Sequence, residues 1–147
     1  MSTSNLPMPV LAEKLQTASA TQGASIYFAA PKSQRDTPRY RQLLAHLRAL
    51  FPDARIIEGL AAFRDTAHWR ATWPAVLASL SVLVFIADGD GWIGRGVWVE
   101  VQQARTRVPV YLLTDDGQLV PLARVSCSAP RPDNWTSHVQ VRAGQED

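Results

Sequence analysis

Hydrophobic residues occur in this chain as short runs separated by longer amphipathic segments. The runs at residues 25–30, 54–58, 81–87 and 108–113 have the length and the aliphatic or aromatic content of strands. Residues 81–87 are apolar almost throughout, which is typical of a central strand buried on both faces. We therefore expect four strands, with residues 81–87 near the middle of a sheet.

In the segments between these runs, apolar residues recur at the spacing of a helix. Residues 39–51 carry one apolar stripe with charged and polar residues between its members, and residues 95–106 also predict a helix. A third helix is expected at residues 67–80. It is expected to start or kink at Trp73-Pro74, because proline has no backbone N–H to donate to the hydrogen bonds inside a helix. The stripe of the first helix contains Tyr40, Leu43, Leu44, Leu47, Leu50 and Phe51.

Strands that alternate with helices predict a mainly parallel sheet joined by right-handed crossovers. The fold class expected is α/β, a Rossmann-like (flavodoxin-like) three-layer sandwich. In such sheets ligands bind outside the carboxyl ends of the strands. The loops that follow Ala30 and Ala87 are therefore the expected walls of a ligand site.

The two ends of the chain give weaker patterns. Residues 1–23 are rich in Ser, Thr, Ala and Gln and are interpreted as a flexible N-terminal arm with one short helix at 9–18, leaving residues 24–147 as a single domain. Residues 118–128 predict a hairpin or strand pair, and 137–142 one more strand. Loops or connections are expected at residues 31–38, 59–66, 88–94 and 130–134.

Composition narrows the possible functions. The 147 residues carry a formal charge of +2 with no basic block, so there is no strong nucleic-acid signal. A single cysteine, Cys127, excludes an internal disulfide framework, and the dispersed His46, His68 and His138 form no zinc spacing. No apolar run reaches the length of a membrane span, and no leader pattern opens the chain. We expect a cytoplasmic protein without metal or cofactor.

Residues 88–100 join the strongest strand to a helix and contain four glycines in eight residues. At about 100° per residue, Glu100 lies about 60° from Val97, at the edge of the buried face. Its carboxylate is expected to point toward the loop after the first strand. A carboxylate beside Asp88 or Asp90 is the pairing that glycosidic chemistry uses. The alternative is that Glu100 is a solvated residue on a helix flank.

The sequence here resembles the nucleoside 2-deoxyribosyltransferase-like proteins, which include the deoxynucleotide N-glycosidases. The resemblance spans about residues 25–113. Its first part is residues 26–31 followed by polar residues and Arg35, and its second is the strand at 82–87, Gly96 four residues before Glu100, and the strand that contains residues 109–111.

This resemblance implies cleavage of an N-glycosidic bond in a nucleoside or nucleotide, by hydrolysis or by transfer, without a cofactor. It implies that Glu100 is the catalytic nucleophile and that Tyr27 orients it, while Asp88 or Asp90 contacts the sugar or protonates the base. Members of the family are often homo-oligomers. The substrate-binding residues expected on this basis are Ala30, Lys32, Ser33, Arg35, Trp92, Arg95 and Gly96.

Two alternatives stay open. Gly94 and Trp73 stand where family members carry aspartates, which is compatible with a catalytically silent member that binds a nucleotide or a protein. The second alternative is NAD binding, because Gly89-x-Gly91-x-x-Gly94 matches the dinucleotide fingerprint and Asp115 follows at the expected distance. Trp69, one helical turn before Trp73, is interpreted with it as a core or subunit contact.

Overall fold

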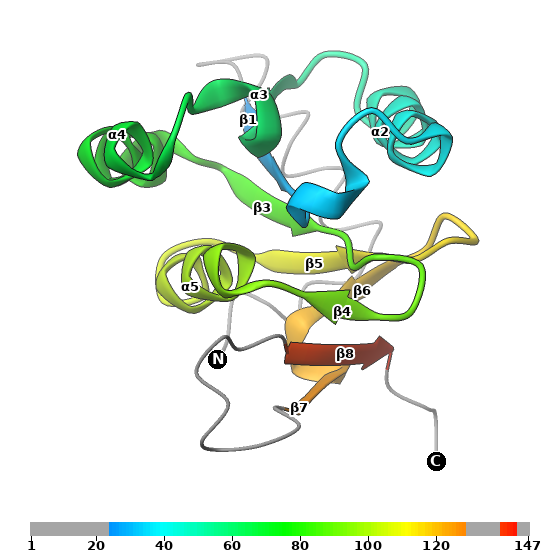
Figure 1. The fold of residues 1–147 in the computed structure, drawn as a ribbon. Helices are drawn as coiled ribbons and strands as arrows, with labels where there is room; N and C mark the ends of the chain where they lie inside the picture. The colour runs from blue at the N-terminus through cyan, green and yellow to red at the C-terminus, as the bar shows by residue number, and fades with distance from the viewer. Residues whose placement is uncertain (1–23, 129–138, 144–147) are drawn as a thin grey trace.

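A five-stranded sheet forms the centre of the computed structural model, which describes residues 24–128 and 139–143 (Figure 1). The strand order is β2-β1-β3-β5-β6, in which the first four strands are parallel and β6 is antiparallel to β5. The expected central position of the third strand is confirmed. The strands are β1 (Ser25–Ala29), β2 (Arg55–Glu58), β3 (Val82–Phe85), β5 (Val110–Leu113) and β6 (Leu119–Pro121).

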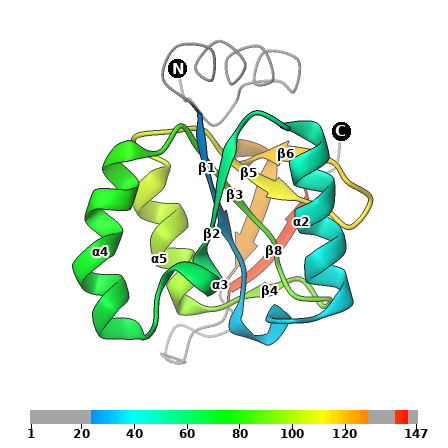
Figure 2. The same ribbon diagram turned by 90° about the horizontal axis from the view of Figure 1, so that it is seen from above.

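Helices cover both faces of this sheet, so the expected α/β sandwich is confirmed. Helix α2 lies on one face, and α4 and α5 lie side by side on the other (Figure 2). The short helix α3 follows β2 directly, in a segment expected to be only a connection. The helices are α2 (Pro38–Leu50), α3 (Gly59–Ala62), α4 (Thr66–Ser79) and α5 (Arg95–Ala104).

Side-chain alternation along β1 divides the core between the two faces. Ile26 and Phe28 pack with Leu47 in the cluster beneath α2. Tyr27 belongs to the opposite cluster, together with Val97 of α5. Because successive residues of a strand point to opposite faces, a strand flanked by helices must be apolar at every position. Tyr27 thereby comes to lie beneath α4 and α5.

The span of α4 agrees with the helix expected at residues 67–80 to within one residue at each end. The helix begins at Thr66, because the Asp65 side chain accepts a hydrogen bond from the His68 backbone N–H at 2.8 Å. Pro74 lies inside the helix, so of the two alternatives expected at Trp73-Pro74, a start or a kink, the start is wrong. Proline removes one backbone donor, and here the cap at the N-terminus and the burial of Trp73 outweigh that loss.

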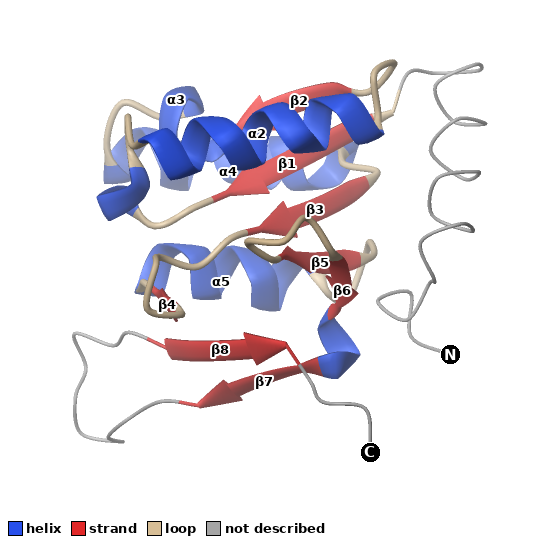
Figure 3. Cartoon of the chain, turned by 90° about the vertical axis from the view of Figure 1, so that its right-hand side faces the viewer, coloured by secondary structure: helices blue, strands red, loops and turns tan. Residues whose placement is uncertain are grey.

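A second, smaller sheet packs below the first (Figure 3). Its order is β4-β8-β7, all antiparallel, with β4 at Trp92–Ile93, β7 at Val125–Ser128 and β8 at Val139–Ala143. Residues 118–128 contain two strands, but the expected hairpin or strand pair is wrong in that they do not pair: the 3-10 helix η3 (Leu122–Arg124) separates β6 and β7, which belong to different sheets. The strand expected at 137–142 is confirmed from residue 139 onward.

Arg39 fixes the loops at the carboxyl ends of the parallel strands. Its guanidinium donates to Gln34 Oε1 at 2.9 Å and to the Ala87 carbonyl at 2.7 Å, and it forms an ion pair with Asp115. Gln34 belongs to the 3-10 helix η2 (Lys32–Gln34), which forms part of the loop after β1. One side chain therefore holds together the segments that follow β1, β3 and β5.

The arm at residues 1–23, its helix at 9–18 and the loop at 130–134 lie outside the described residues. Among the helices that the structure describes, none has the length and apolar content needed to cross a membrane.

Candidate active site

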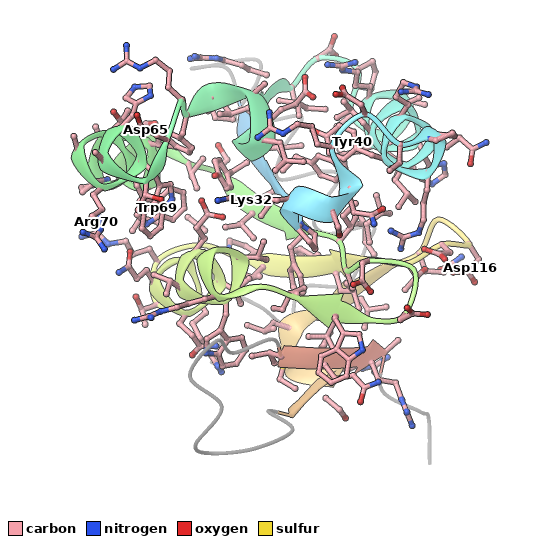
Figure 4. The ribbon with its side chains drawn as sticks, in the orientation of Figure 1. Lys32, Tyr40, Asp65, Trp69, Arg70 and Asp116 are labelled. Atoms are coloured by element: carbon pink, nitrogen blue, oxygen red, sulfur yellow. The ribbon has the colours of Figure 1, made fainter. Side chains whose placement is uncertain are left out.

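A cavity of about 1020 Å³ opens at the carboxyl ends of β1 and β3, between α4, α5 and the loop that contains η2. This is the edge of the sheet at which the strand order predicts a ligand site. The residues that line it include Tyr27, Lys32, Trp69, Asp88, Arg95 and Glu100. Lys32 extends from η2 toward the cavity, and Trp69 extends from α4 toward α5 (Figure 4).

Glu100 points inward from α5, as its angular position on the helix predicts. Its exposed fraction is 6%, although it is a carboxylate. The Tyr27 hydroxyl donates a hydrogen bond to Glu100 Oε2, and the Trp69 indole Nε1 donates to the same oxygen at 2.8 Å. A buried carboxylate is normally stabilised in this way by several donors. The contact between Tyr27 and Glu100 that the resemblance implies is present.

Burial raises the pKa of Glu100 to about 7, and the hydrogen bonds from Tyr27 and Trp69 partly oppose that rise. The pKa of Tyr27 is also raised, first by burial and then by the adjacent carboxylate. Tyr27 therefore keeps its proton and acts as a donor at neutral pH. Glu100, in contrast, changes its protonation state within the physiological range.

The position of the Tyr27 hydroxyl depends on Gly59. A Cβ atom built on Gly59 would lie 2.5 Å from the Tyr27 hydroxyl oxygen and 2.9 Å from the ring carbon that carries it. Tyr27 cannot easily move aside, because its ring packs against Trp73 at 4.9 Å and Phe63 at 6.3 Å between centroids. Sequence reasoning missed Gly59, although a glycine directly after a strand indicates a close approach of backbone.

Trp69 was also missed as a site residue. Trp73 is buried in the core as interpreted, and its indole donates to Gln103 Oε1 at 2.7 Å. Trp69 lies one turn earlier on the same face of α4, where its indole reaches Glu100. The four-residue spacing places both rings toward α5, and the polar N–H of each finds an acceptor there. The spacing alone does not show which ring borders the cavity.

All seven expected substrate-binding residues line the cavity, whereas Asp90, one of the residues expected to be catalytic, is exposed and does not. Asp88 is at the cavity wall, where its Oδ1 accepts the backbone N–H groups of Asp90 at 2.8 Å and Trp92 at 3.0 Å. Of the two carboxylates expected beside Glu100, Asp88 therefore shares its cavity while its Oδ1 stabilises the turn, and Asp90 faces solvent outside the lining. The lining includes Ala30, Lys32, Ser33, Arg35, Trp92, Arg95 and Gly96.

The glycine loop does not have the geometry of a dinucleotide-binding turn. That motif needs a strand that passes by a tight turn directly into a helix, whereas β4 intervenes here between β3 and α5. Gly91 adopts a positive φ of 88°, and its carbonyl accepts the Val141 N–H at 2.8 Å. Asp115, the expected ribose ligand, is instead paired with Arg39. This geometry gives NAD binding through the fingerprint no support.

Within residues 24–128 and 139–143, no group of three or more His, Cys, Asp or Glu side chains is placed to hold a metal ion. No protein-family model, no curated protein and no solved structure matches the chain. The resemblance to the deoxyribosyltransferase-like family therefore stays a prediction, and the function has to be argued from the geometry around Glu100.

Proposed function

We propose that the protein cleaves the N-glycosidic bond of a nucleoside or nucleotide, with Glu100 as the nucleophile. The observation that carries this proposal is a buried carboxylate at a cavity wall with one oxygen fixed by two donors. Both donors, Tyr27 and Trp69, bind Oε2. Neither of these two donors hydrogen-bonds to Oε1. The second oxygen of the carboxylate, Oε1, is therefore the one available to attack a sugar carbon.

The reaction proceeds in two steps. Glu100 Oε1 attacks C1′ while the bond from C1′ to the base breaks, through a transition state with oxocarbenium character. Water then releases the sugar from the glycosyl-enzyme, or a second base accepts it. The attacking carboxylate must be ionised, and a pKa of about 7 leaves roughly half of it ionised at neutral pH. Tyr27 and Trp69 hold its orientation through both steps.

The rest of the cavity suits the other parts of a nucleotide. Trp92, like Trp69 and Phe63, is half-buried at the wall, and these rings offer faces on which a base can stack. Lys32, Ser33 and Arg35 are exposed at the opening, where they can bind a phosphate group. These contacts give the substrate its position relative to Glu100.

The test is release of free base from a panel of nucleosides and nucleoside monophosphates, measured by liquid chromatography. The wild-type protein is expected to release base, and Glu100→Gln is expected to abolish release. Glu58→Gln is the matched control, because Glu58 undergoes the same change but is not among the cavity-lining residues. Absence of release by the wild type, or its persistence in Glu100→Gln, contradicts the proposal.

A nucleotide-binding protein without catalysis is the second candidate. Gly94 lines the cavity six residues before Glu100, where transferases of the resembling family carry an aspartate. Asp88, which could substitute for it, holds the turn of its own loop. Binding of a nucleotide without any release of base would favour this candidate.

A further inference from the structure

The wall of the cavity around Glu100 is acidic and aromatic. The Trp69 indole lies against the carboxylate at 2.8 Å, and the Tyr27 ring contacts it through the hydroxyl. Phe63 borders the same cavity, 6.3 Å from Tyr27 between ring centroids. A carboxylate surrounded by aromatic rings is complementary to a flat cation, because ring faces attract positive charge and the carboxylate neutralises it.

The rim of the cavity has the opposite charge. Five cationic residues line it, and all are exposed: Lys32, Arg35, Arg64, Arg70 and Arg95. They come from four segments, namely the η2 loop, the connection before α4, α4 itself and the start of α5. Exposed arginine and lysine side chains are suited to phosphate oxygens. The cavity therefore favours a ligand that is cationic at one end and anionic at the other.

Proton supply to a leaving base is restricted in this cavity. Besides Glu100, its described lining contains two carboxylates, Asp65 and Asp88. Asp65 Oδ1 accepts the His68 N–H at 2.8 Å as the cap of α4, and Asp88 Oδ1 accepts two backbone N–H groups. Each therefore uses one oxygen, Oδ1, as an acceptor in local structure. A purine or pyrimidine usually leaves with the help of an acid, whereas a base whose ring nitrogen is already positive needs no proton.

We propose that the substrate is a nucleotide with a positively charged glycosidic nitrogen, that is, a pyridinium nucleotide of the nicotinamide type. This inference rests on the proposed function, since it assigns the substrate class of the same Glu100 site. The pyridinium ring lies against Trp69 and Phe63, and the phosphate lies at the cationic rim. The nucleotide here is cleaved, which differs from the dinucleotide binding by the glycine fingerprint described above.

The chemistry balances without an acid. Glu100 Oε1 forms a bond to C1′, the bond from C1′ to the ring nitrogen breaks, and its electron pair neutralises the pyridinium charge. Nicotinamide leaves as a neutral molecule. Water then bonds to C1′, the ester bond to Glu100 breaks with its electron pair returning to the carboxylate, and the proton of water passes to solvent. The products are nicotinamide, the sugar phosphate and one proton.

The test compares three substrates under the same conditions: nicotinamide mononucleotide, its reduced dihydropyridine form and adenosine monophosphate. The first two share sugar and phosphate and differ in the charge of the ring. Release of nicotinamide from the oxidised form is expected to exceed release of base from the other two by at least about 100-fold in kcat/KM, the lower range of a general-acid contribution. Glu100→Gln is expected to abolish it.

A variant tests the aromatic wall separately. Phe63→Leu removes the ring but keeps an apolar side chain, and it is expected to raise KM for the oxidised substrate by about fivefold, as loss of a cation–π contact would. The affinity for the reduced form, measured by calorimetry, is expected to stay the same. An equal loss for both forms would overturn the assignment of this wall to the cationic ring.

The outcomes separate the inference from the function on which it rests. Glu100-dependent release of base from adenosine monophosphate at the same rate as from the oxidised pyridinium nucleotide overturns the substrate class and leaves the glycosidase proposal intact. Absence of release from every substrate, including the nucleosides of the wider panel, overturns both. Preferential release from the oxidised form supports both.

Discussion

Replacement of Glu100 by glutamine is expected to change how the stability of the protein depends on pH. Glutamine keeps the side-chain length and an oxygen that can accept from Tyr27 and Trp69, but it cannot ionise. The wild-type carboxyl has an exposed fraction of 6%. Ionising this carboxyl in the folded state therefore lowers the free energy of unfolding of the wild type. The variant has no such ionisation and does not lose this stability.

The magnitude follows from the pKa of Glu100, which rises from its ordinary 4.5 to about 7 on folding. When the pH is below the lower of these two pKa values, both the folded and the unfolded state hold the proton. Between the two values the unfolded state releases the proton first, so the free energy of unfolding falls as pH rises. The loss saturates above the higher value. At 1.36 kcal/mol per pH unit, Glu100 alone removes about 3 kcal/mol of stability across this window.

Urea denaturation followed by tryptophan fluorescence, repeated between pH 4.5 and 8, measures this effect. The informative quantity is the free energy of unfolding of the variant minus that of the wild type, because other titrating groups cancel in the difference. This difference is expected to increase with pH through the window and then to level off. A difference that stays constant with pH would refute the assignment of a raised pKa to Glu100.

Further predictions concern the hydroxyl that contacts Glu100 and one turn far from it. Base release is expected to rise with pH through about 7 as Glu100 ionises, and a pH series of kcat/KM checks this. Tyr27→Phe removes a donor that lowers the pKa of Glu100, so the midpoint of that profile should move upward. Gly59→Ala forces the Tyr27 hydroxyl away and should shift the midpoint in the same direction; an unchanged midpoint would show that the hydroxyl tolerates the methyl group. Gly117→Ala places a Cβ 2.7 Å from His46 Nε2 at a φ of +85° and should destabilise the fold by about 1–3 kcal/mol in thermal melts, with the midpoint unchanged.

The parts of the fold that sequence reasoning predicted depend on local periodicity. Apolar runs identified the four parallel strands, and the angular position of Glu100 relative to Val97 placed its carboxylate on the inner face of α5. Both patterns can be recognised from residues that are close together in the sequence. The span of α4 was also predicted, whereas the alternative start at Trp73-Pro74 is wrong because the cap that Asp65 supplies begins the helix at Thr66.

Features that depend on distant partners were not predictable in this way. The two residues of β4 form a strand only because they pair with β8, far along the chain. The role of Trp69 likewise depends on how α4 packs against α5, which the spacing to Trp73 does not specify. Gly59 is constrained by a tyrosine on another strand. Each of these contributions to the site exists only in the folded chain.

The pairing of β4 with β8 has a consequence for when the surroundings of Glu100 form during synthesis. The strand β4 immediately precedes α5, and β8 holds it through Trp92 and Ile93 and through the bond from Val141 to Gly91. Nascent chains that end before β8 lack this attachment, so the helix that carries Glu100 starts from a loop without its link to the second sheet. We therefore expect the Glu100 carboxylate to reach its final position only after the ribosome has completed β8.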